Sequence, residues 1–359
     1  MVLMLKGFRV CPVSVNLNVA PPSIEFKGAL GLKPKESHSS LEEVDIVDVF
    51  HCDGLLLCTT KDSRLVVWNP CLGVTKWIQS KLVYKFISRF TLGYILNNKS
   101  WRSYKILRWW SFSSGPKFEI YEFGSDSWRV LNDVVLDCDI QYCGYSSSAS
   151  SLKGNTYWVA TDNKEGYAFV LSFDFTAERF QRLRLPLFQN DIGQVTLSVG
   201  REEQLSALNR SYTFSKIEMW VTNKIDIDSE LLWSKSFIVD LPVFSYPIIF
   251  FTSLLIDAEK KVSLCCDIGT GHLGSLLKVY TVGEDDKYCT ETPSKCGHDP
   301  DPVIFNYVPM TKGDNGILSE SVRTNNSDNA TEAKTEALLK PPLLGMSFWC
   351  QGGVEMCEV

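Results

Sequence analysis

Short hydrophobic runs with a period of two, closed by turn residues, dominate the chain. β-Branched and aromatic residues fill these runs, and Gly, Asp, Asn, Ser or Pro bound most of them, which is typical of strands. The clearest candidate strands are residues 55–60, 64–68, 103–110, 118–123, 155–161, 169–175, 216–222 and 262–268. Few windows show helical periodicity, so the pattern predicts an all-β fold.

The candidate strands also recur at a regular spacing. In each unit an apolar stretch ends in an aromatic residue, a polar turn follows, and a second strand begins; the aromatic marks are Trp68, Tyr121, Phe173, Trp220 and Tyr280. Successive marks lie 53, 52, 47 and 60 residues apart. Spacings of about 40–50 residues are typical of β-propeller blades. We therefore predict at least five blades, with the first 50 residues supplying a sixth or completing a closing blade. A large β-sandwich is the alternative.

The composition changes near residue 310. Residues 311–336 contain only three large apolar residues amid Asn, Ser, Thr, Glu and Lys. Such a segment buries too little apolar surface to offset the entropy of ordering the chain. The sequence thus predicts a propeller-like domain over residues 1–309 and a mostly disordered tail over residues 310–359.

Composition narrows the functional classes. The 359 residues include 36 Lys and Arg against 42 Asp and Glu, a formal net charge of −6. Nucleic-acid-binding proteins usually carry a concentrated basic surface, so we expect no nucleic-acid partner. Aromatic residues make up 12% of the chain while only four residues are His, which suits a β-rich scaffold better than a His-based metalloenzyme.

No segment has the character of a signal peptide or a membrane span. Lys6 and Arg9 interrupt the apolar run at the N-terminus. The most apolar segment, residues 241–256, is shorter than the roughly 20 residues that a spanning helix needs, and it contains two prolines. We expect a core strand there and no membrane partner. The twelve cysteines include no C-x-x-C pair, so we expect reduced thiols and a cytoplasmic or nuclear protein.

Three motifs suggest chemistry without the context that chemistry requires. The G-x-G-x-x-G at residues 269–274 is followed by a candidate strand, so a glycine-rich hairpin is expected rather than a dinucleotide loop. Cys289, Cys296 and His298 have the wrong spacing for a structural zinc site. His51 precedes a turn and a strand, with no catalytic motif beside it. We predict no catalytic residue, no metal site and no cofactor.

The segment over residues 101–110, which includes one of the candidate strands, interleaves basic and aromatic residues. They are Trp101, Arg102, Arg108, Trp109 and Trp110. The first interpretation is a strand with alternate residues facing core and solvent. The second is a set of anchors for a protein partner, which aromatic and Arg side chains often provide. Stacking on single-stranded nucleic acid comes third, given the acidic chain.

The segment over residues 50–78, FHCDGLLLCTTKDSRLVVWNPCLGVTKWI, resembles the plant F-box-associated domain. In that family a D-G-L-L-L-C strand leads to a V-V-W-N-P turn and then to a G-x-T-x-W-I strand. The resemblance continues through FEIYEFGSDSWRVL at 118–131 and FDFTAERFQRLRLP at 173–186, and it covers residues 1–309. It implies a kelch-like or galactose-oxidase-like β-propeller. The signature residues, which we assign to turn geometry and blade packing, are Asp53, Gly54, Trp68, Asn69, Pro70 and Trp77.

The resemblance implies substrate recognition in an SCF-type ubiquitin ligase. Typical members carry an N-terminal F-box that binds a Skp-type adaptor and, through it, a cullin, while the associated domain binds the target protein. This sequence contains no recognisable F-box pattern, so adaptor and cullin binding is expected only if an F-box is supplied. We expect a protein-interaction module and not an enzyme. The alternatives are a propeller enzyme of galactose-oxidase or glycoside-processing type, and a non-functional truncated paralogue.

Overall fold

The computed structural model describes most of the first 310 residues. These are residues 1–16, 23–33, 43–79, 88–96, 102–112, 115–132, 134–141, 149–189, 191–200, 203–211, 213, 216–225, 231–240, 251–257, 262–271, 274–283, 294–296 and 302–310. They belong to one compact unit, residues 1–321. Within the described residues every regular element is a strand, which confirms the all-β prediction.

The strands form six antiparallel sheets, numbered here from 1 to 6. Sheet 1 contains β25 (Val303–Asn306), β1 (Val2–Lys6), β2 (Arg9–Asn16) and β3 (Ser23–Phe26). Sheet 2 contains β4 (Ile46–Cys52), β5 (Leu55–Thr60), β6 (Leu65–Asn69) and β7 (Val74–Ile78). Sheet 3 contains β8 (Arg89–Leu96), β9 (Arg102–Phe112), β10 (Gly115–Glu122) and β11 (Ser127–Val130).

The second half of the unit repeats this plan. Sheet 4 contains β12 (Cys138–Ile140), β13 (Ser150–Leu152), β14 (Asn155–Asp162), β15 (Ala168–Asp174) and β16 (Arg179–Leu183). Sheet 5 contains β17 (Gln194–Val199), β18 (Leu205–Arg210), β19 (Lys216–Thr222) and β20 (Trp233–Asp240). Sheet 6 contains β21 (Phe251–Asp257), β22 (Val262–Gly271), β23 (Gly274–Gly283) and β24 (Ser294–Cys296).

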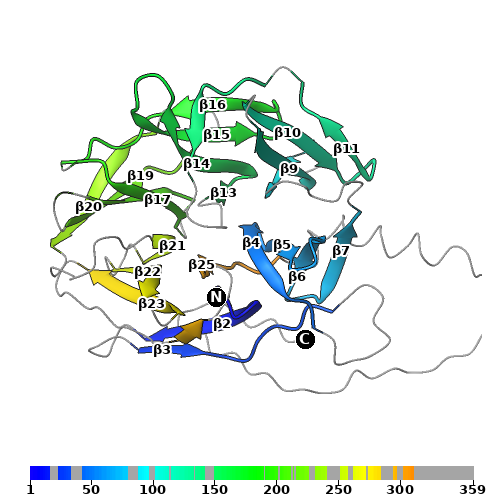
Figure 1. Cartoon of the computed structure of the whole chain (residues 1–359), viewed down its shortest axis with the longest axis horizontal. Coiled ribbons are helices and arrows are strands. Elements are labelled where there is room, and N and C mark those ends of the chain that lie inside the picture. Colours follow the sequence, from blue (N-terminus) through cyan, green and yellow to red (C-terminus); the bar gives the residue numbers. More distant parts are fainter. Residues whose placement is uncertain are drawn as a thin grey trace, which may run out of the picture. The chain divides into compact units, whose positions relative to one another are not determined.

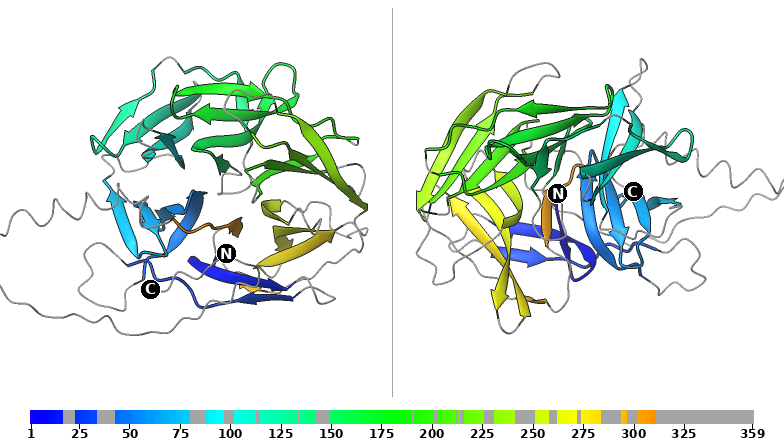
Figure 2. Two further views of the ribbon diagram at one scale, coloured as in Figure 1. Left: turned by 180° about the vertical axis from the view of Figure 1, so that it is seen from behind. Right: turned by 45° about the horizontal axis from the view of Figure 1, so that its top comes forward.

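The six sheets follow one another around a common axis. Strands β4, β8, β14, β17 and β21 each contact the sheet before them, and β21 contacts β25 of sheet 1, so the series closes on itself. Figures 1 and 2 show this circular arrangement, with β4, β13, β21 and β25 toward the middle and β7, β11 and β20 toward the rim. The chain therefore folds as a β-propeller, as the aromatic spacing predicted, and the described strands make six blades.

Strands from both ends of the domain build the closing sheet. Strand β1 pairs with β25, with Val2 opposite Asn306 and Leu5 opposite Val303. The ladder continues past the strands, because the Tyr307 amide donates to the Met1 carbonyl at 2.8 Å. The prediction that the first 50 residues supply a sixth blade is confirmed, and so is the prediction of a closing blade, since these strands do both.

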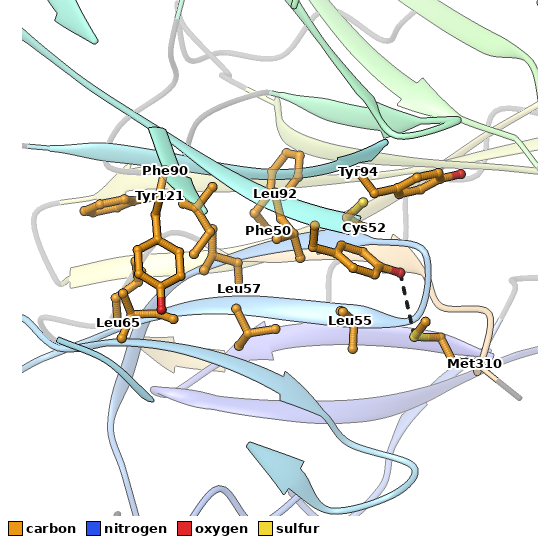
Figure 3. Close-up of a cluster of buried hydrophobic side chains, with 14 residues drawn as sticks. Phe50, Cys52, Leu55, Leu57, Leu65, Phe90, Leu92, Tyr94, Tyr121 and Met310 are labelled. Atoms are coloured by element: carbon orange, nitrogen blue, oxygen red, sulfur yellow. Dashed lines mark hydrogen bonds between the residues drawn. The ribbon is translucent and has the colours of Figure 1, made fainter. Parts of the chain in front are cut away.

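The core lies between neighbouring sheets. The cluster between sheets 2 and 3 includes Phe50, Leu57, Leu92 and Tyr104, with Met310 at its edge (Figure 3). The Tyr104 hydroxyl donates to Met310 Sδ at 3.9 Å. The first three repeat marks, Trp68, Tyr121 and Phe173, are all buried. The fourth mark, Trp220, is half-buried. In sheets 2, 3 and 4 the regular aromatic spacing thus reflects one large core side chain per blade.

Several sequence predictions fall wholly or partly outside the described residues. The division between residues 309 and 310 stays a prediction, because residues 311–359 are not described. The apolar segment 241–256 is described only from residue 251, where it forms β21. Across the described residues, no helix has the length and apolar character that crossing a membrane requires. The G-x-G-x-x-G glycines join β22 to β23, with Gly271 opposite Gly274, which confirms the predicted hairpin.

Candidate functional site

The signature residues Asp53 and Gly54 form the two-residue turn between β4 and β5. Both have positive φ, 53° and 82°, the backbone geometry that a tight hairpin needs. A Cβ at position 54 would lie 2.6 Å from Met310 Cγ and 2.8 Å from the Val308 carbonyl oxygen. Only glycine therefore allows residues 307–310, the segment after β25, to cross this turn. We call these residues the closing segment.

A second signature residue, Asn69, shapes the turn after β6. Its buried side-chain oxygen accepts hydrogen bonds from the amides of Cys71 at 3.1 Å and Leu72 at 3.2 Å, an Asx turn. The Tyr307 hydroxyl reaches the same region and donates to the Gly54 carbonyl at 2.9 Å. Asn69 thus fixes a turn beside the closing segment.

The remaining signature residues lie within sheet 2 or at its edge. Trp68 is buried. Pro70 and Trp77 are half-buried, and the Arg64 guanidinium lies 4.5 Å from the Trp77 ring centroid. Every signature residue therefore lies in a turn or packs against neighbouring side chains. The assignment of these residues to folding stays a prediction until they are substituted.

His51 lies on β4, where its side chain packs against Phe305 of β25 and Tyr307 of the closing segment. Its ring is 5.4 Å from that of Phe305 and 5.5 Å from that of Tyr307. Its Nε2 accepts a hydrogen bond from the Gly54 amide at 3.2 Å. Burial lowers the pKa of His51 from 6.5 to about 4. The imidazole is therefore neutral near pH 7 and serves as an acceptor.

The basic and aromatic contact candidates mostly make contacts within the domain. Trp101 lies outside the described residues. Arg102 Nε lies 2.9 Å from the Asp53 carboxylate, so the structure brings a contact candidate against a signature residue. Arg108 is buried and pairs with Glu119 at 2.8 Å.

The two remaining candidates, Trp109 and Trp110, directly follow Arg108 on β9. Trp109 is 6% exposed and packs edge-to-face on Trp158, with ring centroids 5.5 Å apart. Trp110 is half-buried, and the Arg108 guanidinium lies 4.5 Å from its ring centroid. The role of these residues as partner contacts stays a prediction, and the burial of Trp109 leaves it little surface to offer.

A different region carries exposed apolar side chains. At one end of sheet 4, three connections meet: residues 131–137 from β11 to β12, residues 163–167 from β14 to β15, and residues 184–193 from β16 to β17. Strand pairing places them together, since Cys138 lies opposite Asp162 and Val170 opposite Leu183. We call the described residues of these connections the three-loop surface. Its exposed apolar residues are Val135, Tyr167, Leu187 and Ile192.

The first connection is held to the core by alternate side chains. Val134 and Leu136 pack against the cluster between sheets 3 and 4, whereas Val135 between them is 88% exposed. The Leu131 amide donates to the Phe118 carbonyl at 3.0 Å. The backbone is fixed at both sides of Val135, so its exposure is built into the fold.

The second connection is a turn organised by Asp162. Its Oδ1 accepts hydrogen bonds from the amides of Lys164 at 2.9 Å and Glu165 at 2.8 Å. Its Oδ2 accepts from Arg182 Nη1 at 2.7 Å. The Glu165 amide and the Arg182 guanidinium lower the pKa of Asp162 to about 2. The carboxylate therefore stays ionised, and the turn keeps its shape, throughout the physiological pH range.

Arg182 joins the second connection to the first. It lies on β16 and donates to Asp162, to the Tyr167 hydroxyl at 3.1 Å, and through Nη2 to Asp137. Its guanidinium lies 4.4 Å from the Phe169 ring centroid. One side chain thus links two connections and supports Tyr167.

The third connection has its own tethers to sheet 5. The Gln189 amide donates to the Glu218 carboxylate at 2.9 Å, and Trp233 Nε1 donates to the Arg184 carbonyl at 2.9 Å. The Asp191 carbonyl accepts from Asn209 Nδ2 at 3.0 Å. Leu187, in the middle, is 89% exposed.

This arrangement suits the binding of another macromolecule. Apolar side chains exposed on rigid backbone lose little conformational entropy when a partner covers them, and clustered exposed apolar residues mark interaction sites. Within the described part of the chain, no three His, Cys, Asp or Glu side chains come together as a metal site. Sequence reasoning missed the surface, because whether Val134 or Val135 faces the core depends on packing between sheets.

Fold and surface together define a class: a six-bladed β-propeller with a rigid, partly apolar face suited to protein interaction. Comparison with known proteins gives the family. The model of the F-box associated beta propeller domain matches residues 1–311. The chain belongs to this family, as the sequence resemblance predicted.

The relatives in Arabidopsis thaliana carry matching names. F-box protein At3g22700 is 54% identical over 277 residues, which are 75% of this chain and 78% of that protein. F-box/kelch-repeat protein At3g44120 is 41% identical over 320 residues, 85% of this chain and 80% of its own length. Another relative, whose name also combines an F-box with kelch repeats, is 53% identical over 322 residues, covering 86% and 82%.

Among solved structures, TolB from Acinetobacter baumannii matches with a TM-score of 0.40 at 12% identity, over 84% of this chain and 65% of that one. The propeller assignment rests instead on the six sheets and their closure.

Proposed function

We propose that this chain recognises a target protein for an SCF-type ubiquitin ligase. The observation that carries the proposal is the match of residues 1–311 to the F-box associated beta propeller domain, together with relatives named F-box proteins. The three-loop surface supports it, because rigid loops with exposed apolar side chains suit the grip of a protein partner.

The proposed mechanism is binding alone. The propeller holds the target by contacts on one face, while the adaptor and the cullin are reached through an F-box, present on the same polypeptide or supplied to it. The chain itself forms and breaks no covalent bond. Such a role belongs in the cytoplasm or the nucleus, where we place the protein.

The docking of the ligase subunits can be tested in plant extract. The tagged chain is recovered and probed for the Skp-type adaptor and the cullin, beside a fusion that carries an F-box at the N-terminus. We expect only the fusion to recover both subunits. Recovery of both by the unfused chain would contradict our view that adaptor docking needs a supplied F-box.

Target recognition needs a separate measurement. The F-box fusion is expressed in plant cells, and protein abundance is compared with a fusion of the same F-box to an unrelated propeller. We expect a defined set of proteins to fall in abundance and to recover when the proteasome is inhibited. No difference between the two fusions would contradict the proposal and favour a remnant that engages no target.

A further inference from the structure

We infer that the three-loop surface is the docking face of this propeller, and that its partner is a protein segment with aliphatic side chains beside a lysine or arginine. The inference rests on the proposed function and adds to it the face and the chemistry of the target. The occupant to which the inference commits is a segment of the target protein.

The charge of the partner follows from a stripe along the first connection and β12. Residues alternate there, with Leu136 and Cys138 toward the core and Val135, Asp137 and Asp139 toward solvent. The Asp137 side chain is 61% exposed. One aliphatic side chain is thus followed by two carboxylates on the same side of the strand.

The cations nearby neutralise this stripe only in part. Arg182 divides its guanidinium between Asp137 and Asp162. The carboxylate of Asp139 pairs with no cation among the residues that the structure describes. A lysine or arginine of a partner would find at Asp137 and Asp139 an opposite charge that is still accessible.

The charges on the three-loop surface are unevenly distributed, with the acidic residues at the end nearer the propeller axis. Strands β12 and β13 both pair with β14 at the inner edge of sheet 4, and β16 is the outermost strand. Exposed Arg184 follows β16 directly, so it lies at the rim side, while Asp139 lies at the inner side. Exposed Lys164 and Glu165 are adjacent in the middle turn and balance each other. We therefore expect the partner's cation at the inner end of the surface.

Aliphatic contacts would come from Val135 and Leu187. Both are almost fully exposed, and each is fixed by tethers on either side of it. They flank sheet 4 on its two sides. Neighbouring strands are about 5 Å apart and packed sheets about 10 Å apart, so one extended segment of about ten residues, roughly 33 Å long, can cover both.

The test is selection of a random 12-residue peptide library, displayed on phage, against the full chain. We expect enriched peptides to place Lys or Arg near two aliphatic residues. Binding of an enriched peptide, measured by fluorescence anisotropy, should fall at least tenfold in the variants Val135→Asp and Leu187→Asp. The matched control is Leu96→Asp, because Leu96 is 61% exposed and lies at the end of sheet 3 away from the three-loop surface. The affinity of this control variant for the peptide should stay within twofold of that of the unmodified chain.

A charge exchange separates docking from damage to the fold. The variant Asp139→Lys should weaken the basic peptide at least tenfold and should bind better a peptide in which the Lys or Arg is replaced by Glu. Loss of folding could not produce such a reversed preference. All variants are also compared by thermal melting.

Three results would overturn the inference: no enriched peptide, enriched peptides without a basic residue, or peptides that bind the Leu187→Asp and Val135→Asp variants as tightly as the unmodified chain. These outcomes leave the proposed function standing if the F-box fusion still removes specific proteins from cells. Conversely, the proposed function fails if that fusion removes none, whatever the peptide selection yields.

Discussion

The glycine in the signature turn offers a test of how the closing segment is seated. In Gly54→Ala, alanine must adopt a left-handed conformation, at φ 82°, which costs about 1 kcal/mol. The added Cβ would also collide with Met310 and the Val308 carbonyl. Displacing Met310, which is 9% exposed, forfeits about 2 kcal/mol of apolar burial. The free energy of unfolding should therefore fall by about 3 kcal/mol.

Gly73 supplies the matched control. It has a similar φ of 66°, but nothing lies within 4 Å of a Cβ built there. Gly73→Ala should therefore lose only about 1 kcal/mol, from backbone strain alone. Urea unfolding followed by tryptophan fluorescence compares the two variants. Equal losses would refute the reasoning, because they would mean that residues 308–310 do not rest on the turn.

Three further predictions follow from other contacts. The pKa of His51 is about 4 in the folded chain against 6.5 ordinarily, so the unfolded chain takes up the proton first as the pH falls. The free energy of unfolding should therefore be constant above pH 6.5 and fall by up to about 3 kcal/mol as the pH drops to 4. The variant His51→Gln should reduce this pH dependence, as measured by urea titrations at pH 4.5 and 7.5. Arg182→Gln should speed amide hydrogen exchange at Lys164 and Glu165 about tenfold, because it frees the turn, and unchanged exchange would contradict the linking role of Arg182. Trp109→Ala should lower the free energy of unfolding by about 3 to 5 kcal/mol, as for a buried aromatic, and a change below about 1 kcal/mol would show that Trp109 is not part of the core.

The propeller could be predicted because each blade has the same packing requirement, which recurs in the sequence at a regular spacing. Every sheet needs apolar residues on both faces, and a large aromatic side chain recurs in the core, so Trp68, Tyr121 and Phe173 mark the period in the sequence. The closing sheet left a weaker signal. Val2 pairs with Asn306 across almost the whole domain, and strand composition alone does not identify a partner at that distance.

The candidate surface was harder to predict for a physical reason. Adjacent valines at 134 and 135 have the same side chain, and only the packing between sheets 3 and 4 determines which one faces solvent. Likewise, the local pattern left Arg108 and Trp109 open as strand residues or as partner contacts. Cross-strand register pairs Arg108 with Glu119, and packing between sheets 3 and 4 places Trp109 against Trp158. The direction in which such a side chain points depends on contacts with residues distant in the sequence, so the local pattern does not predict it.

The central claim is that this propeller selects a protein target with the three-loop surface. The most direct measurement compares, in plant cells, F-box fusions that carry the unmodified propeller, the double variant Val135→Asp/Leu187→Asp, or the control Leu96→Asp. Protein abundance is measured with and without proteasome inhibition. The account predicts that one set of proteins falls with the unmodified and Leu96→Asp fusions and is restored with the double variant. Loss of the same proteins with all three fusions would contradict it.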